Sequence, residues 1–113
     1  MKYFKLSEFD SPDMVGSSEA MDKEFLSRLD QARSIAGVPF KITSGFRTPQ
    51  HNAKVGGVEN SSHIIGHAAD IACSNSVYRF KIITSLLKAG FTRIGIADSF
   101  IHVDNDPSKS GNV

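Results

Sequence analysis

Two histidines and one aspartate in this chain have the residue types and the spacing of a metal site. His63 and Asp70 lie seven residues apart in the segment SSHIIGHAAD, which spans residues 61–70, and His102 lies in the segment FIHVD, residues 100–104. Imidazole nitrogens with one carboxylate oxygen suit zinc, and a site with only three protein ligands keeps a fourth position open for water or substrate. If the three side chains converge on one zinc ion, the sequence predicts a hydrolase.

The local pattern around these residues indicates how they are presented. On a helix, His63 and Asp70 would share a face two turns apart, but Gly66 and the alternation of residues 68, 70 and 72 favour a turn that leads into a strand. His63 would then lie at the edge of a loop, Asp70 on the strand, and His102 on a neighbouring strand. His67 is out of phase with Asp70 along the strand and is expected to point away from it.

The other elements follow from apolar spacing and from capping residues. The sequence predicts a helix that begins at Ser17 or Ser18 and ends before Gly37, and a second helix over about 77–89, capped by Ser74 or Ser76. Strands are expected over 40–44, 68–73, 93–97 and 100–104, the last two as a hairpin, and a short helix is expected to start at Thr48-Pro49.

The apolar residues expected to face the core fall into three groups. The irregular N-terminal segment contributes the first group, the first long helix the second and the later helix the third. They are Tyr3, Phe4, Leu6 and Phe9; Met21, Phe25, Leu29, Ala32 and Ile35; and Phe80, Ile83, Leu86 and Leu87.

These elements predict an α+β fold, with a small antiparallel sheet, helices on one face and a cleft on the other. With 113 residues the chain is expected to form a single domain, and the motifs lie between residues 40 and 104. The polar tail, residues 105–113, is expected to fray.

Composition excludes several classes of function. The net charge is +1 with no block of like charge, so neither nucleic acid nor an anionic membrane is an expected partner. The single Cys73 forms no internal disulfide and is expected to be a small buried residue. No continuous apolar segment marks a signal peptide or a membrane span, which predicts a protein that is cytoplasmic as synthesised. A monomer is favoured.

Three motifs in order carry a family resemblance. The pattern Ser61-x-His63-x-x-Gly66-x-Ala68-x-Asp70 resembles the signature of the M15 zinc peptidases, which include D-alanyl-D-alanine carboxypeptidases and phage endolysins. The segment SGFRT, residues 44–48, resembles the element that precedes this signature, and FIHVD resembles the closing histidine strand. The likeness runs from about residue 40 to 104 and implies a fold like that of the D-Ala-D-Ala peptidases and the related hedgehog domain.

The resemblance implies roles for individual residues. His63, Asp70 and His102 would bind one zinc ion. Arg47 would face the substrate beside the metal and stabilise the oxyanion, with a surface ion pair as the alternative, and Ser61 would touch the substrate. Gly66 and Ala68 would be small for structural reasons.

The general base is where the chain departs from the family pattern. Several relatives carry an acidic residue three positions before the last ligand, and here that position is Ser99. Asp98 is the first candidate for the base, and Asp104 the second. Because side chains alternate along a strand, Asp104 shares a face with His102 and is also expected to orient its imidazole.

The resulting hypothesis is a zinc-dependent D,D-peptidase that cuts peptidoglycan stem peptides, either a carboxypeptidase or an endopeptidase of the endolysin type. Without a signal peptide, a phage or prophage protein that another factor releases to the cell wall is favoured. The competing hypothesis is a non-catalytic module stabilised by zinc, which would bind the cell wall or serve as a phage structural component.

Overall fold

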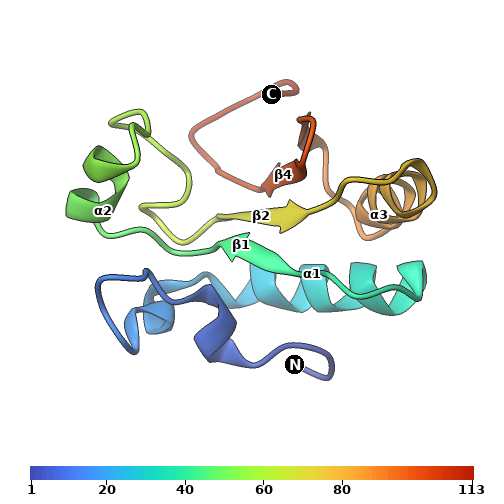
Figure 1. The fold of residues 1–113 in the computed structure, drawn as a ribbon, viewed down its shortest axis with the longest axis horizontal. Helices are drawn as coiled ribbons and strands as arrows, with labels where there is room; N and C mark the ends of the chain where they lie inside the picture. Colours follow the sequence, from blue (N-terminus) through green and yellow to red (C-terminus); the bar gives the residue numbers. More distant parts are fainter.

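The computed structural model describes residues 1–113, and a four-stranded antiparallel sheet organises it (Figure 1). The strands are β1 (Ile42–Ser44), β2 (Ala68–Ala72), β3 (Arg93–Ile96) and β4 (Phe100–Asp104), in the spatial order β1-β2-β4-β3. The helices are α1 (Lys23–Ala36), α2 (Pro49–Lys54) and α3 (Ser76–Lys88). The predicted α+β class and the hairpin of β3 and β4 are therefore confirmed.

The sheet separates an apolar side from a polar side because its side chains alternate. Ala69 and Ile71 of β2 and Ile101 and Val103 of β4 join a cluster of 19 buried hydrophobic residues with α1 and α3. Asp70 alternates with Ala69 and Ile71 and therefore faces the other way. The helices α1 and α3 pack against each other, and α2 lies at the opposite end of the molecule from α3 (Figure 1).

The first long helix begins later than the sequence predicted. Residues Ser17–Ala20 form a separate 3-10 turn, Met21 is extended, and Asp22 caps α1 by accepting a hydrogen bond from the Phe25 N–H at 2.9 Å. The expected cap at Ser17 or Ser18 is wrong, because the Asp22 carboxylate meets the free N–H groups of the helix start. Gly37 ends the helix in the left-handed conformation, as predicted.

The N-terminal segment is less irregular than expected. Leu6–Phe9 forms a 3-10 helix, and Phe4 and Phe9 are buried, whereas Tyr3 is exposed. A second difference concerns β1, which is shorter than the predicted strand, although Phe40 before it is buried.

The later helix turns a different face to the core than the sequence indicated. Asn75 rather than a serine caps α3, by accepting from the Tyr78 N–H at 2.8 Å. Ile82 and Leu86 are buried, but Phe80 and Leu87 are 69% and 56% exposed, so their predicted core positions are wrong. Ile35 of α1 is likewise exposed. Periodicity gives an apolar stripe, but the packing partner decides which edge of the stripe is covered.

Two smaller expectations have clear outcomes. Cys73 is buried, as predicted. The tail, which was expected to fray, is instead held by hydrogen bonds: Asp106 is buried, and the Asn112 side chain accepts a bond from the Ile94 N–H at 2.7 Å. No helix combines the length and the apolar character needed to cross a membrane.

Candidate metal centre

Strand pairing brings Asp70 and His102 face to face. They are direct partners in the register of β2 and β4, so their side chains rise side by side from the polar side of the sheet. The His102 Nδ1 atom lies 2.9 Å from Asp70 Oδ1. The sequence predicted Asp70 on one strand and His102 on a neighbouring strand, and the structure pairs the two directly.

A loop supplies His63 to the same point. His63 Nε2 lies 3.3 Å from Asp70 Oδ1, and the three donor atoms all lie within 4.8 Å of one another. The loop turns at Gly66, which has φ +76° and packs so closely on Ala20 that a Cβ would collide with the Ala20 carbonyl oxygen. Only glycine meets both demands. The Gly66 carbonyl also accepts from the Asp22 N–H at 2.9 Å, which fixes the loop to the start of α1.

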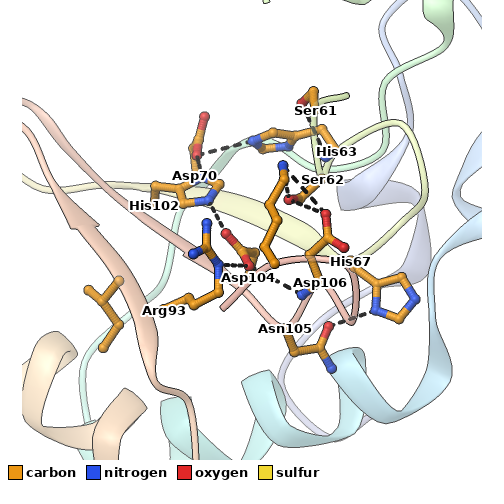
Figure 2. Close-up of polar contacts among 12 residues, drawn as sticks. Ser61, Ser62, His63, His67, Asp70, Arg93, His102, Asp104, Asn105 and Asp106 are labelled. Carbon is orange, nitrogen blue, oxygen red and sulfur yellow. Dashed lines mark hydrogen bonds and ion pairs between the residues drawn. The ribbon is translucent and has the colours of Figure 1, made fainter. Parts of the chain in front are cut away.

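Each histidine has its other ring nitrogen occupied. His63 Nδ1 lies 2.8 Å from the Gly45 carbonyl oxygen. His102 Nε2 lies 2.8 Å from Asp104 Oδ2, as Figure 2 shows. A carbonyl or a carboxylate can only accept, so both nitrogens carry their proton on this outer side. Once a metal ion displaces any proton from the inner nitrogens of His63 and His102, these nitrogens present lone pairs beside the Asp70 carboxylate.

Three electron-pair donors facing one another fit a cation. Tetrahedral zinc with ligands at about 2.0–2.1 Å needs donor atoms about 3.3 Å apart. Two of the three separations, 3.3 Å and 2.9 Å at Asp70 Oδ1, are close to that value, and the two histidine nitrogens lie within 4.8 Å of each other. The donor set and its outer hydrogen bonds therefore fit a zinc ion.

The electrostatics of this group depend on its hydrogen bonds. Burial alone would raise the pKa of Asp70, but hydrogen bonds with His102 and His63 outweigh it and hold the pKa below its ordinary value. Burial alone would lower the pKa of His102, but its bonds to Asp104 and Asp70 raise that pKa to about 9. Without a cation, His102 therefore shares a proton with Asp70 at neutral pH, and a metal ion has to replace that proton.

A cavity of about 480 Å³ opens over the three donors. His63, Asp70 and His102 form its floor, and Arg47 and Ser61 contribute polar wall. The apolar part of the wall consists of Val58, Ile96, Ala97, Phe100 and Val113. The structure thus brings five of the predicted site residues together at one cavity.

Arg47 is held in place from three sides. Its Nε donates to Ser44 Oγ at 3.0 Å, one terminal nitrogen donates to Asn52 Oδ1 at 3.2 Å, and the other lies 3.5 Å from Asp70 Oδ2. The side chain is only 16% exposed, so Arg47 is not a surface ion pair. Its fixed charge faces the cavity beside the donor group.

Ser61 lies at the edge of the same loop. Its hydroxyl accepts a hydrogen bond from the His63 N–H at 3.2 Å, which leaves its own proton free to donate toward the cavity. The small size predicted for Gly66 and Ala68 has a structural reason, since Ala68 is fully buried in β2.

Neither candidate for the general base has a free carboxylate in the cavity. Asp98 lies exposed in the turn between β3 and β4 and is not part of the cavity wall. Asp104 is enclosed: one oxygen faces His102 and the other accepts from Arg93 Nε at 2.8 Å. Burial alone would raise the pKa of Asp104, but its bonds to His102 and Arg93 lower it. The arrangement suits Asp104 to orient His102 rather than to take a proton from water.

Sequence reasoning missed four contributing residues, which are Gly45, Asn52, Arg93 and Asp106. A signal existed for Arg93, because the predicted hairpin pairs it directly with Asp104 across the strands. Gly45 and Asp106 act through contacts between distant segments, for which the sequence offers no local pattern, whereas Asn52 contacts Arg47 and Val58 only five and six residues away.

Three residues that could hold a cation thus lie together on a small antiparallel sheet, and comparisons with known proteins identify the family. A family model described as Peptidase M15 matches residues 2–104, and the chain belongs to this family. A zinc D-Ala-D-Ala carboxypeptidase of Streptomyces albus G is 36% identical over 56 residues, which are 50% of this chain. The match covers 22% of that relative's length.

Proposed function

We propose that this protein is a zinc-dependent D,D-peptidase that hydrolyses peptide bonds in peptidoglycan stem peptides. The convergence of His63, Asp70 and His102 below an open cavity carries the proposal. The family and the name of the Streptomyces relative support the reaction and the substrate class. When bound, one zinc ion would act as a Lewis acid that lowers the pKa of a water ligand and polarises a carbonyl group.

The residues of the cavity wall supply the rest of the site. Arg47 is half-buried, always charged and already oriented, so it is suited to stabilise an oxyanion or to hold a substrate carboxylate. Ser61 can donate its hydroxyl proton to a peptide carbonyl. The apolar wall of Ile96, Ala97 and Phe100 suits small apolar side chains such as the methyl groups of alanine.

One observation favours a second candidate, a non-catalytic zinc module. Apart from Asp70, no carboxylate side chain lines the cavity, because Ser99 replaces the acidic residue of relatives, Asp98 lies outside and Asp104 is enclosed. In such a module the ion would hold the loop of His63 to the sheet and raise stability without turnover.

An assay on purified muropeptides, analysed by mass spectrometry, distinguishes the two candidate functions. A peptidase cleaves them with zinc present and loses cleavage on chelation or in His102→Ala, whereas the matched control His51→Ala retains it, since His51 lies outside the cavity. Release of a terminal alanine identifies a carboxypeptidase, and splitting of cross-linked dimers identifies an endopeptidase of the endolysin type. Zinc binding without any cleavage would sink the enzyme proposal and support the non-catalytic module.

A further inference from the structure

The C-terminal segment connects the two parts of the chain that carry the histidines. The family match ends at residue 104, so this segment, residues 105–113, lies beyond it. Its central residue is Asp106, which is 4% exposed. Asp106 Oδ1 accepts from the N–H and the hydroxyl of Ser108 at 2.9 and 2.6 Å, so a tight turn aims the carboxylate back toward the sheet.

On one side, Asp106 reaches His102 through Asp104. The Asp106 N–H donates to Asp104 Oδ1 at 3.2 Å, and the same oxygen accepts from Arg93. The other Asp104 oxygen faces His102 Nε2 at 2.8 Å (Figure 2). The backbone of Asp106 thus helps to fix the carboxylate that orients the strand histidine.

On the other side, Asp106 reaches the loop of His63. Asp106 Oδ2 accepts from the Ser62 hydroxyl at 2.7 Å, and Ser62 directly precedes His63. Lys109 Nζ lies 3.4 Å from Asp106 Oδ2 and donates to Ser62 Oγ at 2.9 Å and to the Asn60 carbonyl at 2.8 Å. Two side chains of the tail therefore hold the loop immediately before its ligand.

These contacts lie in a dry part of the molecule. Ser62 is 4% exposed, so its hydroxyl has little water to replace a lost partner. Burial alone would raise the pKa of Asp106, but its bonds to Ser108 and Ser62 outweigh it and keep the pKa well below its ordinary value. Asp106 is therefore an ionised and fully bonded link between the loop and β4.

We propose that Asp106 is a positioning residue that holds the His63 loop and the His102 strand at the spacing a bound cation needs. The proposal rests on zinc binding as described under the proposed function. The loop histidine and the strand histidine belong to different elements, and a fixed link between them lowers the ordering cost of metal binding. The tail is then part of the metal centre although it contributes no ligand.

The test compares zinc affinity, measured by competition with a chromophoric chelator, in the full-length protein and two variants. Asp106→Asn removes the charge at constant size, and Ser62→Ala removes only the hydroxyl that bonds to Asp106. Since partners of metal ligands typically contribute 10–100-fold to affinity, we expect each variant to bind zinc about 10-fold more weakly. The visible spectrum of the cobalt-loaded protein, which reports ligand geometry, should change in both.

Asp30→Asn is the matched control. Asp30 holds the other end of the chain, by accepting from the Lys2 and Tyr3 N–H groups at 2.9 and 2.8 Å. Its variant should lose thermal stability but keep the wild-type zinc affinity and cobalt spectrum.

The possible results are distinct. If Asp106→Asn loses stability in the same way as Asp30→Asn and keeps wild-type zinc affinity, Asp106 is only structural and the inference is overturned. If Asp106→Asn fails to fold, the affinity and cobalt spectrum of Ser62→Ala decide the question. Wild-type protein that binds no zinc would overturn the proposed function together with this inference, whereas wild-type binding with unchanged variants would overturn this inference alone.

Discussion

The two histidines of the candidate metal centre are held in different ways. His102 is placed by the sheet ladder and oriented by Asp104, a buried carboxylate that is itself paired with Arg93. His63 lies on a loop and is oriented by the neutral Gly45 carbonyl. A carboxylate partner increases the basicity of an imidazole more than a carbonyl does. The strand histidine is therefore controlled by charge, and the loop histidine by backbone geometry.

We expect the largest effect from replacing either histidine, and the same effect for both. His63→Ala and His102→Ala should each weaken zinc binding by more than about 100-fold, beyond the effect of losing an outer hydrogen-bond partner. Zinc at about 100 times its Kd stabilises a protein by about 2.7 kcal/mol, which for a domain of this size raises Tm by roughly 10 °C. Calorimetry with and without a chelator should show this rise in wild type and its absence in both variants. A rise that persists in one variant would show that the deleted histidine is not a ligand.

Asp104→Asn acts first on the strand histidine, which Asp104 contacts directly. The amide keeps the size but loses the charge that orients His102 and pairs with Arg93, so zinc affinity should fall about 10–100-fold. Leaving a largely buried guanidinium without its partner should also lower the free energy of unfolding by about 3 kcal/mol. Zinc titration and urea denaturation of the metal-free protein measure the two effects separately. Unchanged zinc affinity would mean that charge does not control this histidine.

Gly66→Ala is the corresponding change in the loop. A side chain at φ +76° is strained, and its Cβ would collide with the Ala20 carbonyl oxygen, so the loop has to move. We expect a loss of about 2 kcal/mol in unfolding free energy, together with weaker zinc binding. Nuclear magnetic resonance of the histidine rings should show His63 displaced while His102 keeps its hydrogen bond to Asp104. Equal displacement of both rings would contradict the assignment of Gly66 to the loop histidine.

We expect the smallest effect from Asp22→Ala, which tests whether the side-chain cap of α1 helps to position the His63 loop. The substitution removes the side-chain cap of α1, which is worth about 1 kcal/mol, but keeps the backbone hydrogen bond from residue 22 to the Gly66 carbonyl. Thermal unfolding should therefore shift by a few degrees while chelator competition gives the wild-type zinc affinity. A clear loss of affinity would show that the helix cap, and not only the backbone, positions the loop.

Local patterns in the sequence predicted most of the helices and strands. Alternation predicted β2 and β4, and with them the common face of Asp70 and His102, because a strand repeats every two residues whatever surrounds it. The starts of the two long helices were predicted less well, because Asp22 and Asn75 compete with nearby serines as caps and only the folded chain selects one. The exposure of Phe80 has a similar reason, because the spacing of apolar residues on a helix does not show which edge of the apolar stripe packs against the core.

The sequence by itself predicted the three candidate metal donors, most of the elements that present them and the family to which the chain belongs. The tertiary structure decided what the outer ring nitrogen of each histidine contacts. The Gly45 carbonyl lies next to His63, and Asp104, itself paired with Arg93, lies next to His102. The tail carboxylate of Asp106 bonds to Ser62, directly before His63. The tertiary structure also enclosed Asp104 and left Asp98 outside the cavity. The physical reason is that strand and turn preferences act over a few residues, whereas hydrogen bonds between distant segments form only when the core has brought those segments together.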